Sequence, residues 1–292
     1  MHVFITGATG WVGSAVVKQL IGAGHRVTGL VRSDNKAAAL AATGATVLHG
    51  TLDNLDVLKR AAAEADAVIH TAFNHDFSKF AENSEQDRRA IETLGSTLEG
   101  SDRPLLVTSG VAMLAPGRVA TEADMPTPHP SMPRKSEATA QALAARGVHA
   151  ATVRLAPSVH GLGDHGFIPI LIRIARETGV SAYIGEGLNR WPGVHVQDAA
   201  RLYRLALEHG VTERAYHATA DEGVAFRDIA EVIGRRLGIP VESRTREHFG
   251  WFGDFAAADM PASSRHTREV LGWEPTHAGL LQDIDQPGYF DQ

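Results

Sequence analysis

The sequence predicts an α/β fold built on a parallel sheet, and three observations point to it. Strand-like and helix-like segments alternate through the first half of the chain, as in β-α-β units. The first strand-like run ends in a turn with glycines three residues apart, and an apolar-striped helix follows at once. The 292 residues are 43% hydrophobic and 21% charged, which suits one large domain with an appended lobe. We therefore expect a Rossmann-type doubly wound parallel sheet with a smaller C-terminal α+β substrate lobe.

The turn after the first strand has the composition of a phosphate-binding loop. Gly7 permits a tight turn, Gly10 lets a pyrophosphate approach the backbone, and Gly13 lets the helix pack closely on the strand. N–H groups at the start of the helix then face the anion. The alternative is an ordinary structural turn, because spaced glycines alone are a weak signal. The predicted dinucleotide contacts here are Gly7, Thr9, Gly10, Trp11 and Val12.

The alternation also fixes where a ligand would bind. Strands are expected at 2–6, 25–31, 45–48, 66–71, 104–109 and 150–155, with helices near 12–22, 34–42, 54–64, 83–99 and 134–146. Ligands of such sheets lie beyond the carboxyl ends of the strands. The residues just after each strand are therefore the candidates for cofactor and substrate contacts.

The end of the second strand bears on the choice of cofactor. Arg32 follows that strand directly and Ser33 adds a hydroxyl, a pair suited to the 2′-phosphate of NADP(H). Asp34 is the competing signal, since an acid there would accept hydrogen bonds from the ribose of NAD(H). In its other interpretation, Asp34 caps the next helix through its side chain. We favour NADP(H), with NAD(H) as the alternative.

Two further strand ends are expected to contact the cofactor. After the third strand, Leu52 could pack on the adenine ring and Asp53 could accept a hydrogen bond from its amino group. Equally, Asp53 or the asparagine after it caps the next helix. After the fourth strand, His70, Thr71 and Ala72 form a segment where backbone groups can approach the cofactor.

The fifth strand ends in two hydroxyl residues, Thr108 and Ser109. Hydroxyl groups at that edge point into the cleft and can polarise a substrate carbonyl. Upstream, a polar loop carries Phe73, Phe77 and Phe80. Their rings either line a substrate pocket or pack against the next helix.

The chain beyond the sixth strand is expected to form most of a substrate lobe. Residues 1–160 would bind the cofactor, with later segments returning to that domain, and residues 161–292 would mainly bind substrate. Helices are expected at 167–178, at 226–237 and after Asp198, which would cap its helix. The segment 183–196 predicts two short strands, and its Arg190, Trp191 and His195 suggest a retained substrate pocket.

Composition excludes several kinds of site. The sequence has no cysteine, which excludes thiolate nucleophiles, disulfides and Cys-ligated metals. The net charge is −6 with basic residues scattered, so no nucleic-acid or membrane partner is expected. The 15 histidines lack the helical spacing of a zinc pair, and no metal is predicted. Without a membrane-length apolar run or an N-terminal leader, a cytoplasmic location is expected.

Several segments together resemble the extended short-chain dehydrogenase/reductase superfamily, the group that contains nucleotide-sugar epimerases and dehydratases. They are Thr6–Gly13, Gly50–Asp53, Arg154–Gly161, Val194–Asp198 and Leu271–Pro275, and the likeness covers essentially the whole chain. The resemblance implies a nicotinamide cofactor and a small-molecule substrate, with Pro157 and Val159 lining the nicotinamide pocket. By the same analogy it implies a homodimer through two long helices.

One part of that pattern is missing. Members that do redox chemistry use Tyr-x-x-x-Lys on the helix after strand five, where the tyrosine transfers the proton. Here no tyrosine precedes Tyr183. Alignment on Lys135 puts Ser131 in the tyrosine position, and a second alignment puts His129 there. The proton would then have to be handled by His129, Ser131 or His160.

Two functions from different classes remain. The first is an NADP(H)-dependent oxidoreductase that moves a hydride to or from a carbonyl or alcohol carbon of a small organic or sugar-like substrate. Epimerase or dehydratase chemistry is its close variant. The second is a non-catalytic NADP(H) sensor or regulatory protein, which the missing tyrosine favours.

Overall fold

The computed structural model describes residues 1–127 and 133–291, and the chain divides into two compact units. Unit 1 comprises Met1–Ser109, Pro126–Arg154 and Ala200–Tyr216, and unit 2 comprises Gly110–Met125, Leu155–Ala199 and His217–Gln292. The chain therefore passes between the units several times. Segments 110–125 and 155–160 belong to unit 2, while 200–216 returns to unit 1.

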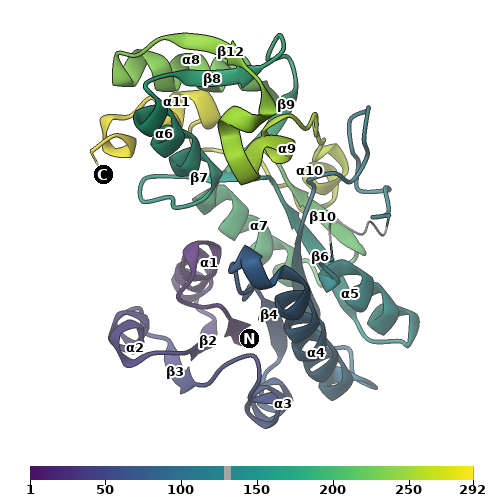
Figure 1. Cartoon of the computed structure of the whole chain (residues 1–292). Helices are drawn as coiled ribbons and strands as arrows, with labels where there is room; N and C mark the ends of the chain where they lie inside the picture. Colours follow the sequence, from purple (N-terminus) through teal and green to yellow (C-terminus); the bar gives the residue numbers. More distant parts are fainter. Residues whose placement is uncertain (128–132, 292) are drawn as a thin grey trace. The chain divides into compact units, whose positions relative to one another are not determined.

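The first half of the chain alternates strands and helices (Figure 1). In chain order the elements are β1 (His2–Thr6), α1 (Trp11–Gly22), β2 (Arg26–Val31), α2 (Asp34–Ala41), β3 (Thr46–His49), α3 (Leu55–Glu64), β4 (Ala67–His70), η1 (Phe77–Lys79), α4 (Phe80–Leu98), β5 (Leu105–Gly110), α5 (Ser136–Ala145) and β6 (Ala150–Leu155). Each predicted strand and helix in this half is present, with ends within three residues of those expected. The short η1 helix was not predicted.

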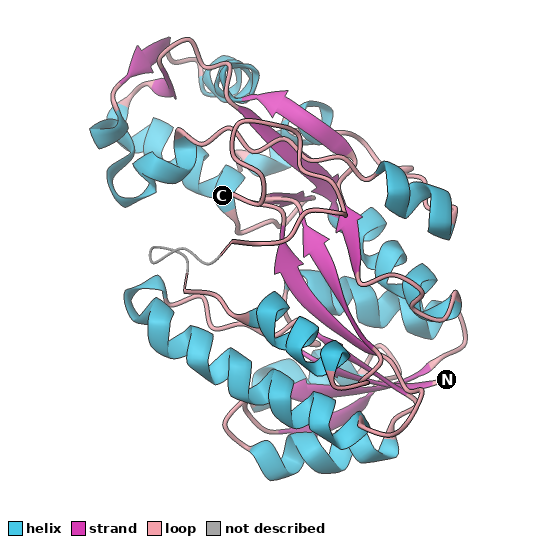
Figure 2. Cartoon of the chain, turned by 90° about the vertical axis from the view of Figure 1, so that its right-hand side faces the viewer, coloured by secondary structure: helices cyan, strands magenta, loops and turns pink. Residues whose placement is uncertain are grey.

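The strands of this half form the main sheet. In the described part of the chain it has seven strands in the order β10-β6-β5-β4-β1-β2-β3, where β10 is Ala215–Ala218. The pairs β1–β2, β1–β4, β2–β3 and β4–β5 are parallel. Helices flank the sheet (Figure 2). The expected Rossmann-type fold is confirmed, and its strand order reverses between β1 and β4.

Alternate strand residues supply the core of unit 1. One cluster joins the sheet to the buried faces of α3, α4 and α5, and it includes Phe4, Val68, Leu105, Val107, Leu58, Ile91, Leu94 and Leu143. The helix α1 buries Val16, Val17 and Leu20, and the two valines precede Leu20 by four and three residues, which places all three on one face. Burial on this scale holds the strand ends, and the loops that follow them, in fixed positions.

The remaining elements follow β6 in chain order. They are β7 (Ser158–His160), α6 (Phe167–Thr178), β8 (Ser181–Ile184), β9 (Arg190–His195), α7 (Val196–Glu208), β10, β11 (Asp221–Ala225), α8 (Phe226–Leu237), β12 (Val241–Arg244), η2 (Arg246–Phe252), α9 (Gly253–Ala256), α10 (Arg265–Leu271), α11 (Leu280–Ile284) and η3 (Pro287–Tyr289). Unit 2 contains a sheet of order β11-β9-β7 and a β12–β8 pair. The expected helices at 167–178 and 226–237 are present, as are two strands within 181–195.

The core of unit 2 is aromatic, and this corrects the expectation for Trp191. Trp191 is fully buried among Phe226, Phe252 and Phe255, so it fills the core of the lobe and does not face a pocket. Arg190 pairs through Nε and Nη2 with both carboxylate oxygens of Asp259, at 3.0 and 2.9 Å. Trp191 therefore serves packing, while Arg190 takes part in an ion pair within unit 2.

Asp198 is a further correction within unit 2. We expected it to cap α7, but it lies inside the first turn of that helix. Its carboxylate accepts hydrogen bonds from the backbone N–H groups of Thr276 and His277, at 3.1 and 2.9 Å. The side chain therefore fastens a distant C-terminal segment to α7. In the described part of the chain, no helix has both the length and the apolar character needed to cross a membrane.

Candidate functional site

The loop between β1 and α1 has the geometry of a phosphate cradle. Gly7 has φ +70°, in the left-handed region that favours glycine, and Gly10 N donates to Gly7 O at 2.9 Å to close the turn. A Cβ on Gly13 would lie 2.1 Å from Gly7 O, so only glycine lets α1 start this close to β1. Gly10 is exposed and directly precedes α1, whose first turn presents N–H groups that the helix itself cannot pair.

This loop meets the segment that follows β4. A Cβ on Gly7 would lie 2.7 Å from Ala72 N and 2.8 Å from Thr71 Oγ1. Thr71 Oγ1 donates to Thr6 O at 2.8 Å and ties the ends of β1 and β4 together. The two strands flank the point where the strand order reverses, which is where such sheets bind dinucleotides. Predicted contacts at both loops therefore lie side by side, and Thr9, Trp11 and Val12 are half-buried there.

Arg32 and Ser33 lie directly after β2, as the sequence suggested. Arg32 is exposed, and its guanidinium makes no hydrogen bond or ion pair with any described residue. Ser33 Oγ donates to Asn35 Oδ1 at 2.6 Å, while Asp34 is fully exposed and 3.5 Å from His49 Nδ1. The residue that caps α2 is Ser33, without a side-chain hydrogen bond, so Asp34 does not cap the helix.

Leu52 and Asp53 follow β3, and their side chains have different surroundings. Leu52 belongs to the core cluster that contains Leu58, so the core and not an adenine ring covers most of it. Asp53 Oδ2 accepts from Gln86 Nε2 at 2.5 Å, and the capping position of α3 is held by Asn54. The turn after β3 aims Leu52 inward, which the sequence pattern did not reveal.

A buried chain of polar side chains runs from β1 through β4 to the start of α5. Thr6 Oγ1 lies 2.8 Å from His70 Nδ1, and His70 Nε2 donates to Asp87 Oδ1 at 2.9 Å. Ser136 Oγ donates to Asp87 Oδ2 at 2.5 Å and accepts from Arg134 Nε at 2.9 Å. Burial acts to raise the pKa of Asp87, but its contacts with His70, Arg134 and Ser136 outweigh it and lower the pKa.

The two hydroxyls at the end of β5 have different environments. Thr108 is buried, and its Oγ1 lies 2.7 Å from the hydroxyl of the fully buried Tyr203. This differs from the expectation that Thr108 could polarise a substrate, because alternate strand residues face opposite ways. Ser109 is half-buried and makes no hydrogen bond to a described residue. Tyr203 is fully buried with its hydroxyl against Thr108, so it is not placed to replace the missing proton donor, and burial raises the pKa of that hydroxyl.

Arg134 occupies a position that the sequence did not single out. Its Nη2 donates to Thr108 O at 3.2 Å, and its guanidinium carbon lies 4.5 Å from the centre of the Phe73 ring. Phe73 also contacts Phe80 edge-on, with ring centres 6.0 Å apart. Burial lowers the pKa of Arg134 from its ordinary value, against the charge of Asp87.

The other predicted residues near α5 fall into two groups. Lys135 is exposed and donates to Glu85 Oε2 at 3.0 Å, so it takes part in a surface ion pair. Hydrogen bonds from Arg88 and Lys135 lower the pKa of Glu85 to about 2. His129 and Ser131 lie outside the described residues.

In unit 2, His160 is part of a buried polar group. It is fully buried on β7, and its Nδ1 lies 2.8 Å from Asp283 Oδ2. The same oxygen accepts from the Tyr289 hydroxyl at 2.6 Å, and Gly161 N donates to that hydroxyl at 2.7 Å. His160 Nε2 has no hydrogen-bond partner among the described residues. Pro157 and Val159 are half-buried, with Val159 on the same strand.

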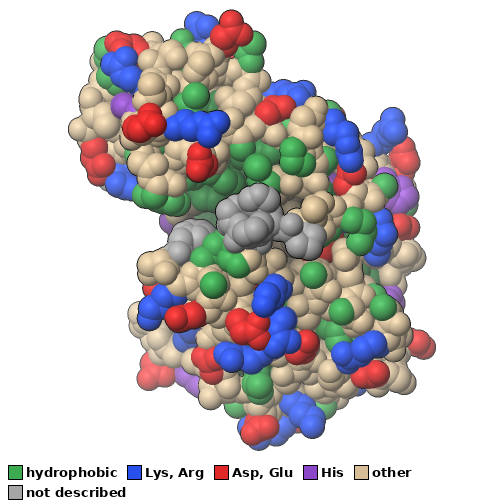
Figure 3. Space-filling model, turned by 45° about the vertical axis from the view of Figure 1, so that its right-hand side comes forward, with side chains coloured by type: hydrophobic (Ala, Val, Ile, Leu, Met, Phe, Trp, Pro, Cys, Tyr) green, Lys and Arg blue, Asp and Glu red, His purple; other side chains and the backbone are tan. Residues whose placement is uncertain are grey.

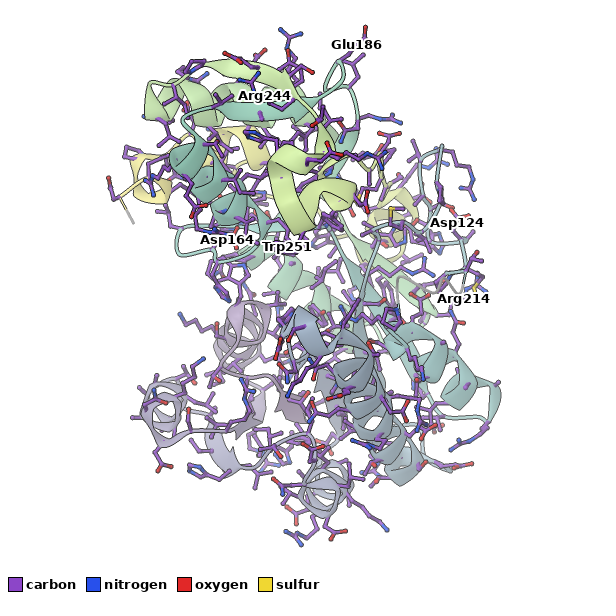
Figure 4. The ribbon with its side chains drawn as sticks, viewed as in Figure 1. Asp124, Asp164, Glu186, Arg214, Arg244 and Trp251 are labelled. Carbon is purple, nitrogen blue, oxygen red and sulfur yellow. The ribbon has the colours of Figure 1, made fainter. Side chains whose placement is uncertain are left out.

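The loop between β7 and α6 carries a buried acid, Asp164 (Figure 4). Its side chain is 4% exposed, and its Oδ1 accepts from Gly166 N at 2.7 Å. Burial raises the pKa of Asp164 to about 6, against the opposing hydrogen bond from Gly166. Among residues 1–127 and 133–291, no three acidic or histidine side chains gather in a way that could hold a metal ion.

Acidic and basic side chains are interspersed on the face seen in Figure 3. Unit 1 has exposed or half-buried ion pairs such as those between Arg88 and Glu92 and between Lys135 and Glu85. Exposed pairs of this kind contribute little to stability. In unit 1, the features described above that could bind a ligand are the glycine loop, Arg32, Ser109 and Arg134.

Comparison with known proteins agrees with this geometry. The model of the NAD-dependent epimerase/dehydratase family matches residues 3–218. The chain is 49% identical over 296 residues to the uncharacterised protein C2A9.02 of Schizosaccharomyces pombe, covering 99% of this chain and 100% of that protein. It is 29% identical over 253 residues to a 4-hydroxy-2-methyl-3-oxo-4-farnesyl-3,4-dihydroquinoline-1-oxide ketoreductase of Stigmatella aurantiaca, covering 83% and 75%.

Among solved structures, MoeE5 in complex with UDP-glucose and NAD superposes with a TM-score of 0.76. The alignment covers 99% of this chain and 98% of that one, at 21% identity, which shows the shared fold. Homologues thus include a protein named as a ketoreductase. The chain belongs to the NAD-dependent epimerase/dehydratase family.

Proposed function

We propose that the protein is an NADP(H)-dependent oxidoreductase that acts on a carbonyl or alcohol carbon of a small organic or sugar-like molecule. The observation that carries the proposal is the glycine loop packed against the end of β4 at the point where the strand order reverses. Unit 1 would hold the cofactor, and unit 2 would contribute mainly to substrate binding. The relative named as a ketoreductase supports this class of reaction.

Arg32 supports NADP(H) over NAD(H). Its exposed guanidinium has no acidic partner among the described residues, so a 2′-phosphate would not have to displace one. Asp34, the competing acid, does not cap α2 and is fully exposed, so its carboxylate remains available to a ribose and NAD(H) stays the alternative. A charge-assisted hydrogen bond to a phosphate contributes about 1.5–3 kcal/mol, which corresponds to roughly 10- to 150-fold in affinity.

Ser109 is the chain's best-placed hydroxyl for the substrate oxygen. It is the last residue but one of β5 and follows Thr108, whose own hydroxyl contacts Tyr203. The nicotinamide would supply or accept the hydride, and the Ser109 hydroxyl would donate a hydrogen bond to the oxygen of the reacting carbon. Among the remaining candidates for the proton, His129 and Ser131 lie on the chain just before Arg134.

The cofactor assignment is tested by titration calorimetry on three proteins. We expect Arg32→Ala to weaken NADPH binding at least tenfold and NADH binding less than threefold. Arg26→Ala is the matched control, because Arg26 is exposed at the opposite end of the same strand, and we expect no change. Equal losses for both nucleotides in Arg32→Ala would contradict the assignment to the 2′-phosphate.

Turnover is tested with NADPH and a panel of aldehydes, ketones and oxo acids, followed by the loss of reduced-nicotinamide absorbance. We expect Ser109→Ala to lower kcat about 100-fold with unchanged NADPH affinity. Ser96→Ala, on the surface of α4, serves as the control and should behave like the wild type. If Ser109→Ala had the same kcat as the wild type, Ser109 would have no part in the mechanism.

A second candidate is a nicotinamide sensor without catalysis. The absence of any tyrosine before Tyr183, together with the buried and engaged hydroxyl of Tyr203, favours it. The sensor would bind NADPH at the same loop but reduce none of the panel. Tight NADPH binding without turnover of any carbonyl or reverse reaction with alcohols would select the sensor over the enzyme.

A further inference from the structure

We propose that Arg134 anchors a carboxylate of the substrate, so that the protein acts on carbonyl or hydroxy acids. The inference rests on the proposed function and adds the substrate class. Arg134 is held at the carboxyl ends of β4 and β5, between the Phe73 loop and Thr108. Ligands of doubly wound sheets bind at that edge. Ser109, the hydroxyl proposed to contact the reacting oxygen, is the residue after Thr108.

The guanidinium is fixed in place by three groups on different segments. Its Nε donates to Ser136 Oγ at 2.9 Å, its Nη2 donates to Thr108 O at 3.2 Å, and Phe73 covers it at 4.5 Å. A cation held against an aromatic face by two hydrogen bonds has little rotamer freedom left to lose. The arrangement is therefore preorganised for a ligand.

The hydrogen bonds of Arg134 to the described residues leave several N–H groups of its guanidinium unused. A guanidinium has five N–H donors, and the two protein hydrogen bonds use one on Nε and one on Nη2. Nη1 makes no hydrogen bond to a described residue. The N–H groups left on Nη1 and Nη2 form a planar fork, which matches the two oxygens of a carboxylate.

Nearby carboxylates do not satisfy this fork. Asp87 makes no direct hydrogen bond to Arg134, because the hydroxyl of Ser136 accepts from Arg134 and donates to Asp87, although the charge of Asp87 still acts on the guanidinium. Both oxygens of Asp87 are engaged, one by Ser136 and one by His70. The charge of Asp87 offsets part of the cost of burying this cation, and an anionic group of the substrate in direct contact with the guanidinium would lower that cost further.

The test compares oxo acids with their methyl esters. The probes are acetoacetate, 2-oxobutyrate and the two corresponding esters, measured as substrates with NADPH and as ligands of the NADP⁺ complex by calorimetry. For the wild type we expect the acids to bind at least tenfold more tightly than the esters. In Arg134→Met we expect this preference to vanish while NADPH affinity stays within twofold of the wild type.

Two further variants complete the design. Arg134→Lys keeps the charge but not the planar fork, so we expect an intermediate acid preference, and it provides the readout should Arg134→Met fail to fold. Arg60→Met, an exposed arginine on α3, is the control and should keep the full preference.

The outcomes separate this inference from the proposed function. Reduction of ketones or esters without any preference for acids, or an acid preference that survives in Arg134→Met, would overturn the inference alone. A loss of NADPH affinity in Arg134→Met would also overturn it, since Arg134 would then serve the cofactor. Absence of all turnover would reject the enzyme, and calorimetry with the acids would still decide whether Arg134 binds a carboxylate.

Discussion

At the scale of single residues, the glycine loop depends on the absence of one carbon atom at Gly13. A Cβ there would approach Gly7 O to 2.1 Å, and the obstacle is backbone that cannot rotate away. Gly22, at the end of the same helix, has nothing within 4 Å of the equivalent position. Substitutions at the two glycines can therefore be compared. The one at Gly13 reports on the close packing of strand and helix, and the one at Gly22 reports on the general effect of a glycine in a helix.

We expect Gly13→Ala to lower the free energy of unfolding by about 1–3 kcal/mol and to weaken NADPH binding at least tenfold, because α1 must move away from β1. Gly22→Ala should leave binding unchanged and alter stability by less than about 1 kcal/mol. Urea denaturation and calorimetry provide the two measurements. Equal behaviour of the two variants would contradict the cradle geometry.

Asp164 gives a second prediction at this scale. Its pKa of about 6 in the folded protein lies above the ordinary value, so the folded state binds its proton more tightly than the unfolded chain. The stability contributed by this proton is fully present below about pH 4 and is lost as the pH rises through about 6. Asp164→Asn should therefore raise the free energy of unfolding at pH 7 by about 1–3 kcal/mol.

Urea unfolding of the wild type and of Asp164→Asn at pH 4 and pH 7 provides the measurement. The two proteins should differ little at pH 4, where the wild-type carboxyl is protonated. A variant that is equally or less stable than the wild type at pH 7 would show that Asp164 is ionised without cost in its loop.

At the scale of secondary-structure elements, the His70–Asp87 contact joins β4 to α4, and Ser136 extends it to α5. The pKa of Asp87 is lowered in the folded state, so its stabilising effect is present above its unfolded pKa, near 4, and is lost as the pH falls further. Asp87→Asn should cost about 1–3 kcal/mol at pH 7 and should reduce the loss of stability between pH 4 and pH 2.

The measurement is urea unfolding of the wild type and Asp87→Asn across that pH range, with Asp56→Asn on the exposed face of α3 as the control. If Asp87→Asn lost as much stability in acid as the wild type, the pKa of Asp87 would have to be the same in the folded and unfolded states.

Local patterns predicted most of the elements. The alternation of strand-like and helix-like segments predicted β1 and α1, and the glycine after Leu237 predicted the end of α8. The helix α4 starts at Phe80, directly after η1. The side chain of Asp76 accepts a hydrogen bond from Ser78 N and so caps the start of η1. That contact depends on a loop conformation which periodicity does not encode.

The side-chain partners were harder to predict than the elements. His70 and Asp87 lie 17 residues apart and Thr108 and Tyr203 lie 95 apart, so only the fold brings them together. Strand-end position alone suggested Thr108 and Ser109 equally, but strand alternation separates their roles. Arg134 had no motif to mark it, since its setting comes from Phe73, Thr108 and Ser136.

At the scale of the whole molecule, the proposed function depends on the binding of one ligand. The glycine loop, the reversed strand order and the family all point to a nicotinamide dinucleotide bound by unit 1. A ligand that binds only the folded protein stabilises it by about 2.7 kcal/mol at a concentration 100 times its Kd. Binding should therefore appear both as heat and as a higher melting temperature.

Titration of the full chain with NADPH in a calorimeter is the most direct test of this central claim. The account predicts one NADPH bound per chain, with an affinity at least tenfold higher than for NADH. Folded protein that gives no heat and no melting shift with either nucleotide would contradict it.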